Sequence, residues 1–127
     1  MMDRIETQTE RRQRKRFKAI EGAFAALVNH NSKLGQIKDI STTGLSFRYI
    51  EDHGQSDDAQ ELKIILGNRG LYLDKIPFRK IFDFEIINEY SFSSIKMRQI
   101  GLQFGELTAD QQHRLHDFIQ QHTLGEV

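Results

Sequence analysis

The sequence LGQIKDISTTGLSFRYI, residues 34–50, predicts a β-hairpin. In its second half, Gly44 to Ile50, apolar and polar residues alternate, which is typical of a strand with one buried face. The apolar residues of that face are Leu45, Phe47 and Tyr49. Leu34 to Ile40 is also rich in apolar residues, and Ser41-Thr-Thr-Gly44 between the two halves has the composition of a turn. Two strands joined by such a turn form a hairpin.

Further short strands are predicted on both sides of this hairpin. They cover Phe17 to about Asn29, Leu62–Leu66, Leu71–Leu73 after a tight turn at Gly67–Gly70, the long stretch Ile76–Ile87, and Ser94–Phe104. The Phe and Ile residues of Ile76–Ile87 are interpreted as core, with an exposed partner surface as the alternative.

The end of the chain changes to a helical period. Leu115, Phe118, Ile119 and His122 follow the spacing i, i+3, i+4, i+7. Thr108 with Gln111 three residues later is typical of a helix start, so we expect one amphipathic helix at about residues 109–122. Many short strands followed by one helix indicate an all-β antiparallel barrel or sandwich with a helix against it.

The composition limits the class of protein. The 127 residues suit one domain, and the absence of cysteine excludes disulfides and thiolate metal sites. A formal net charge of zero argues against a general nucleic-acid binder. The longest apolar run, Ala23 to Val28, is far shorter than the about 20 residues of a membrane span. The first residues lack the apolar segment of a signal peptide, so we expect a cytoplasmic protein without a transmembrane segment.

Positive charge is concentrated near the start, where six of the eight residues from Arg11 to Lys18 are basic. A guanidinium fork matches two phosphate oxygens, or O6 and N7 of guanine. Arg12 and Arg16 are four residues apart, so one helical turn would place them on one face. For residues 11–16, the arginine arm, the alternative when this segment is taken alone is a solvated basic tail.

Asp39 and Ser41 are the second candidate pair. On a strand their side chains would point the same way, with Asp39 accepting from the N–H groups of guanine and Ser41 donating to a phosphate oxygen. Gly44 suits a turn with positive φ or a close approach of the backbone to a ligand. The alternative for this segment is an Asx-turn or Ser-turn within a hairpin.

Catalytic and metal chemistry find little support in the sequence. His113 and His116 are three apart on the predicted helix, but no third ligand is fixed by a motif, so a solvated helix face is favoured over a metal site. Ser41 lacks the Gly-x-Ser-x-Gly context of a nucleophile. An enzyme acting on a phosphate ester is a third reading that lacks an acid/base constellation, so we expect no enzyme and no cofactor.

The two candidate segments together resemble a known family. Arg-x-x-x-Arg at Arg12–Arg16, followed by Asp-x-Ser-x-x-Gly at Asp39–Gly44, is similar to the PilZ domain, the bacterial receptor for cyclic di-GMP. The resemblance covers about residues 10–122, including Arg98–Phe104 and the final helix. It implies a six-stranded antiparallel β-barrel with a C-terminal α-helix. Residues 1–9 would then be a flexible segment and residues 123–127 a tail.

The resemblance also implies a ligand site and a mode of action. The implied ligand-binding residues are Arg11, Arg12, Arg16, Asp39, Ser41, Gly44 and Arg98. A basic residue at position 11 goes with an intercalated ligand dimer in similar proteins. The expected function is a non-catalytic receptor whose arginine arm becomes ordered on cyclic di-GMP and which signals to a separate protein in motility, secretion or exopolysaccharide control. The alternative is a protein–protein adaptor, for example one related to type IV pili, with vestigial nucleotide binding.

Overall fold

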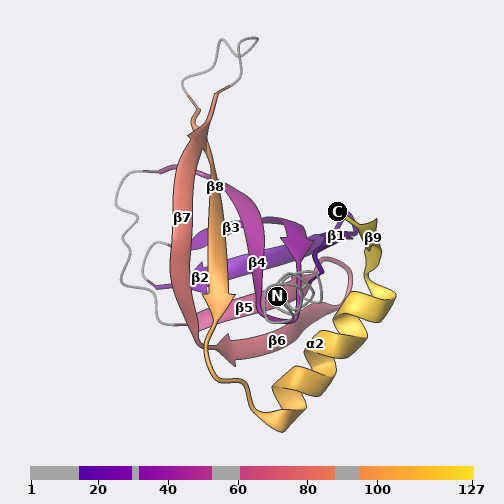
Figure 1. Cartoon of the computed structure of the whole chain (residues 1–127). Coiled ribbons are helices and arrows are strands. Elements are labelled where there is room, and N and C mark those ends of the chain that lie inside the picture. Colours follow the sequence, from indigo (N-terminus) through magenta and orange to yellow (C-terminus); the bar gives the residue numbers. More distant parts are fainter. Residues whose placement is uncertain (1–14, 30–31, 53–60, 88–94) are drawn as a thin grey trace, which may run out of the picture.

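The computed structural model describes residues 15–29, 32–52, 61–87 and 95–127. Strands make up most of this part of the chain, and one α-helix follows them (Figure 1). The strands are β1 (Phe17–Ala19), β2 (Ala23–Val28), β3 (Lys33–Ile40), β4 (Gly44–Ile50), β5 (Glu61–Leu66), β6 (Gly70–Ile76), β7 (Phe78–Ile86), β8 (Met97–Phe104) and β9 (Thr123–Glu126), and the helix is α2 (Ala109–Gln121).

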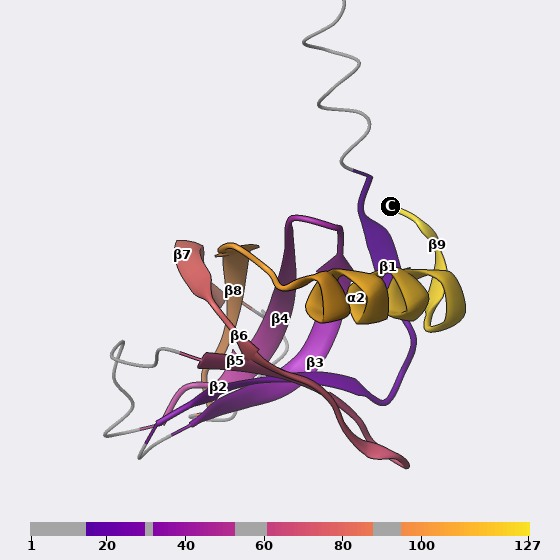
Figure 2. The ribbon, with the colours of Figure 1, turned by 90° about the horizontal axis from the view of Figure 1, so that it is seen from below.

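All strand pairs are antiparallel and form one curled sheet in the order β6-β5-β2-β3-β4-β8-β7, with β1 between β3 and β9 (Figures 1 and 2). The predicted antiparallel β fold with a C-terminal helix is therefore confirmed. The sheet does not close into a six-stranded barrel, because β6 and β7 end the described ladder without pairing to each other. Pro77 lies between them and has no N–H to continue a ladder through this corner.

The hairpin predicted from residues 34–50 is present as β3 and β4. Leu45, Phe47 and Tyr49 are buried on the inner face, as their alternation predicted. The register with β8 places Leu45 opposite Leu102 and Phe47 opposite Ile100, so the two strands contribute to one core. The outer face of the same strands is left for the site described below.

Two predicted segment boundaries were wrong. Phe17 to Asn29 is not one strand: the chain turns at Gly22, whose φ of 88° suits glycine, and this separates β1 from β2. Residues 123–127, predicted as a tail, include β9, which pairs with β1. Because β9 has only four residues, it is too short for an alternation of apolar and polar residues to be recognised in the sequence.

The interpretation of Ile76–Ile87 as core was also wrong for β7. Ile76 is buried, but no side chain of β7 is, and Ile81 and Phe84 are about half exposed. The physical reason is position: β7 is an edge strand with β8 as its one described neighbour.

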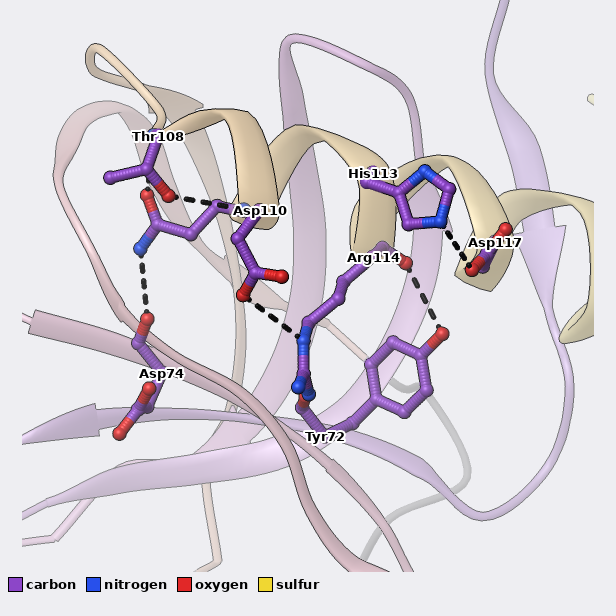
Figure 3. Close-up of polar contacts among 8 residues, drawn as sticks. Tyr72, Asp74, Thr108, Asp110, His113, Arg114 and Asp117 are labelled. Carbon is purple, nitrogen blue, oxygen red and sulfur yellow. Dashed lines mark hydrogen bonds and ion pairs between the residues drawn. The ribbon is translucent and has the colours of Figure 1, made fainter.

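The helix forms where it was predicted and is fixed to the sheet at several points. Thr108 and Gln111 make the reciprocal hydrogen bonds of a capping box, and Leu115 and Phe118 are buried in the core. Figure 3 shows the contacts with β6: the side chain of Gln111 donates to the carbonyl oxygen of Asp74 at 3.0 Å, and the Tyr72 hydroxyl donates to the carbonyl oxygen of Arg114 at 3.2 Å.

At 13 residues, α2 is too short to be a membrane span, and the described parts of the chain contain no other candidate.

Candidate ligand-binding site

Arg16 and Asp39, both predicted ligand residues, lie side by side on the outer face of the sheet. Asp39 lies near the end of β3, opposite Lys18 of β1 on one side and Ser46 of β4 on the other. Arg16 immediately precedes β1, and its Nε lies 3.9 Å from Oδ1 of Asp39. Since the Arg16 side chain is 59% exposed, this is a loose ion pair that leaves donors of the guanidinium facing solvent.

Ser41 lies in the turn after β3 and organises that turn. Its Oγ accepts from the backbone N–H of Thr43 at 3.1 Å and of Gly44 at 3.2 Å, and the Ser41 N–H donates to the Gly44 carbonyl oxygen at 2.8 Å. This is the Ser-turn arrangement that the sequence left open. The Ser41 hydroxyl can also donate, and it has two acceptors within the turn: the Gly44 carbonyl oxygen at 3.4 Å and Oγ1 of Thr43 at 3.2 Å.

Gly44 is needed for close packing of backbone. Its φ lies outside the left-handed region, in contrast to Gly22 and Gly70. A Cβ at this position would lie 2.2 Å from the carbonyl oxygen of Leu102 on β8. Any side chain at residue 44 would therefore push the turn away from β8.

A cavity of about 330 Å³ lies beside this turn. Its lining residues come from the residue before β1, the 41–44 turn, and strands β4, β7 and β8: Arg16, Ser41, Thr43, Gly44, Leu45, Ile81, Phe82, Gly101, Leu102 and Gln103. Three of the predicted ligand residues, Arg16, Ser41 and Gly44, therefore share one cavity.

Sequence reasoning assigned no ligand-binding role to Phe82, Gly101 or Gln103, which also line the cavity. The Phe82 ring occupies the space where a Gly101 side chain would be, with Cε2 2.1 Å from the position of a Cβ. An isolated glycine inside a strand signals such a close approach, and this signal was present in the sequence at Gly101.

A second cavity of about 440 Å³ adjoins the first through Thr43 and Gln103 and extends to α2, where Leu115 and His116 line it.

Arg98 does not lie with the other predicted residues. On β8 it is opposite Tyr49, on the inner face, and it is five residues, or roughly 17 Å, from Gln103. Its Nε donates to Oδ1 of Asp83 at 2.7 Å and its Nη1 lies 3.5 Å from Oε1 of Glu51. The hydrogen bond to Asp83 raises the pKa of Arg98 above its usual value.

Arg11 and Arg12 lie outside the described residues, so their roles stay predictions. The described ranges contain no group of three or more His, Asp or Glu side chains that could hold a metal ion. Nε2 of His113 instead lies 3.6 Å from Oδ2 of Asp117, one turn along the helix (Figure 3).

No protein-family model matches the chain, and no curated protein sequence matches it. Solved structures do match over 83% of the chain. Apo MrkH of K. pneumonia has a TM-score of 0.62 at 19% identity, and the MrkH–c-di-GMP complex has 0.62 at 22%; these matches cover 46% and 48% of the MrkH chains. The PilZ domain of YcgR from Escherichia coli, solved with c-di-GMP, has a TM-score of 0.55 at 14% identity with 86% of its chain covered.

These matches show that the fold is PilZ-like. The chain spans about half the length of MrkH and most of the YcgR domain.

Proposed function

We propose that this protein is a receptor for cyclic di-GMP. The observation that carries the proposal is that Arg16 lines one cavity with Ser41 and Gly44 and also lies beside Asp39, which is outside the lining of that cavity. Support comes from the PilZ-like fold, since the YcgR PilZ domain and one of the matching MrkH structures were solved with c-di-GMP.

The chemistry of the site suits a ligand with both phosphates and guanines. The Arg16 guanidinium is a planar fork that can donate to two phosphate oxygens or stack on a purine ring. The Asp39 carboxylate, whose side chain is 17% exposed, can accept from the N–H groups of a guanine edge.

The arm supplies the remaining contacts in this proposal. Arg12 would bind phosphate or guanine together with Arg16, and Arg11 would favour an intercalated ligand dimer. Ordering of the arm costs conformational entropy, which the charge-assisted hydrogen bonds offset. The protein would bind its ligand without chemical turnover and signal to a separate protein in motility, secretion or exopolysaccharide control.

Titration calorimetry with cyclic di-GMP tests the proposal. We expect the parent to bind, and Arg16→Ala or Asp39→Ala to weaken binding by about 1.5–3 kcal/mol, because each removes a hydrogen bond to a charged group. Arg69→Ala, an arginine in the β5–β6 turn, is the charge-matched control and should bind like the parent. Absence of binding by the parent, or equal affinity of Arg16→Ala and the parent, would refute the proposal.

A second candidate function is a protein–protein adaptor, favoured by an apolar row on the outer face of the sheet. The register places Ile50, Met97 and Ile86 next to one another across β4, β8 and β7. Ile50 is 54% exposed, and Phe84 on the same face of β7 is 49% exposed. A thermal shift separates the two functions: a cyclic di-GMP receptor gains stability with ligand by mass action, and an adaptor with vestigial nucleotide binding does not.

A further inference from the structure

The base of the arginine arm is held from two sides. On one side β1 has two residues in register with β3, with Phe17 opposite Ile40 and Lys18 opposite Asp39. On its other side β1 pairs with β9 along its whole length (Figures 1 and 2). Without β9, Arg16 would be connected to the sheet only through the three residues of β1 and their pairing with β3.

A backbone hydrogen bond connects β9 to Arg16 itself. The N–H of Val127 donates to the carbonyl oxygen of Arg16 at 2.8 Å, and at the other end of the pair the N–H of Ile20 donates to the carbonyl oxygen of His122 at 3.0 Å. These two bonds bracket β1, so the direction in which Arg16 leaves the sheet depends on β9.

The strand β9 is in turn fixed by the helix before it. The Thr123 hydroxyl donates to the carbonyl oxygen of Ile119 at 2.6 Å, and the N–H of His122 donates to the carbonyl oxygen of Phe118 at 2.8 Å. Phe118 is fully buried, and α2 contacts β6 through Gln111 and Arg114 (Figure 3). A rigid path therefore runs from the core through α2 and β9 to Arg16.

We propose that β9 is a positioning element for the ligand site: it holds β1 so that Arg16 stands beside Asp39, and ligand binding in turn tightens the β1–β9 pair. This inference rests on the proposed function, because the ligand is cyclic di-GMP. The coupling is reciprocal by thermodynamic necessity, since a pair needed for binding is stabilised by binding.

Amide exchange on the full chain, measured by NMR with and without cyclic di-GMP, tests the ligand's effect on β9. The N–H groups of Val127 and Ile20 should exchange more slowly in the complex. A merely structural role for β9 would leave their exchange unchanged by the ligand, and that result would overturn the inference.

A pair of glycine variants tests the effect of β9 on affinity. Gly125 in β9 has a φ of 144° and Gly70, the first residue of β6, has a φ of 82°, and a Cβ at either position meets nothing within 4 Å. Alanine therefore introduces backbone strain at both positions without a clash. Gly70 belongs to β6, which β5, β2 and β3 separate from β1.

In Gly125→Ala the strain is relieved when β9 detaches, so the apparent Kd rises in inverse proportion to the fraction of molecules with β9 paired. We expect binding about tenfold weaker in Gly125→Ala and unchanged in Gly70→Ala. Equal affinity of Gly125→Ala and the parent would overturn the inference while leaving the proposed function intact. Absence of binding by the parent itself would instead refute the proposed function, and the inference with it.

Discussion

Arg98 and Asp83 form a partly buried ion pair across β8 and β7. Nε of Arg98 donates to Oδ1 of Asp83 at 2.7 Å, and Nη2 donates to the carbonyl oxygen of the same residue at 3.1 Å. The other carboxylate oxygen, Oδ2, accepts from the Tyr49 hydroxyl at 2.7 Å and lies 3.9 Å from Nζ of Lys33. Side chains from β3, β4, β7 and β8 therefore meet at the carboxylate of Asp83, and the Asp83 side chain is 12% exposed.

Arg98→Ala should destabilise the fold without affecting ligand binding. Removal of the guanidinium leaves the Asp83 charge with fewer donors, so the free energy of unfolding should fall by about 2–3 kcal/mol. Urea unfolding measures this loss, and calorimetry with cyclic di-GMP should give the parent's affinity. Arg79→Ala, on the exposed side of β7, is the control, with a change in stability within about 0.5 kcal/mol. A large loss of affinity in Arg98→Ala would place this residue in the ligand site after all.

Stability should fall at alkaline pH because of Tyr49. Burial of its phenol, together with the hydrogen bond to Asp83, raises its pKa well above the ordinary value of about 10. The folded protein then holds the phenolic proton more tightly than the unfolded chain. The resulting stability is fully present below about pH 10 and is lost as the pH rises above it.

Urea unfolding between pH 8 and pH 11 measures this dependence. Tyr49→Phe should have a lower free energy of unfolding at neutral pH and a flatter decline at high pH. Burial also raises the pKa of Tyr72, so some decline should remain in the variant. An unchanged slope in Tyr49→Phe would show that Tyr49 is not the responsible group.

Ser46→Ala should stabilise the protein. The Ser46 side chain is 1% exposed, and its Oγ is the one buried side-chain oxygen or nitrogen in the described residues without a hydrogen-bond partner. An unsatisfied buried hydroxyl costs free energy that alanine does not, so the free energy of unfolding should rise by about 1 kcal/mol. Urea unfolding gives the sign, and a decrease would show that the hydroxyl is hydrogen-bonded in solution.

Gly44→Ala should destabilise the protein even in the absence of ligand. The added Cβ would lie 2.2 Å from the carbonyl oxygen of Leu102, and backbone on both sides has to shift, at a cost of about 1–3 kcal/mol. Gly67→Ala is the matched control, because its Cβ would have its nearest neighbours at 3.4 Å, an ordinary contact. If Gly44→Ala reduced affinity but left thermal unfolding unchanged, the glycine would serve the ligand and not the packing.

Elements with a strong local pattern were predictable from the sequence. The helix carries both an apolar period and a cap at Thr108, and β4 alternates over its full length. The pairing of β9 with β1 was not predictable, because it joins residues about a hundred positions apart and depends on where α2 ends. The exposure of β7 was missed for a similar reason: an apolar strand at an edge and one in the middle of a sheet have similar compositions.

The candidate site was only partly predictable, because the sequence shows which residue types are present but not where the fold places their side chains. The side chains of Arg16 and Asp39 were named from the residue types that a phosphate and a guanine require, and the fold brings them together. Arg98 was named from the resemblance, but an arginine on a strand looks the same in sequence whether it faces a ligand or a partly buried carboxylate. Phe82 and Gln103 come from strands that only the tertiary fold places beside the 41–44 turn.

The two glycines of the cavity have a consequence for how this site can diversify. Gly44 and Gly101 leave no room for a side chain, because a Cβ at residue 44 would meet the carbonyl oxygen of Leu102 and a Cβ at residue 101 would meet the ring of Phe82. Arg16, Ile81 and Gln103 line the same cavity without this restriction. In the proposed receptor, ligand preference can therefore change by single substitutions at these three positions, while the packing at the two glycines has to be kept.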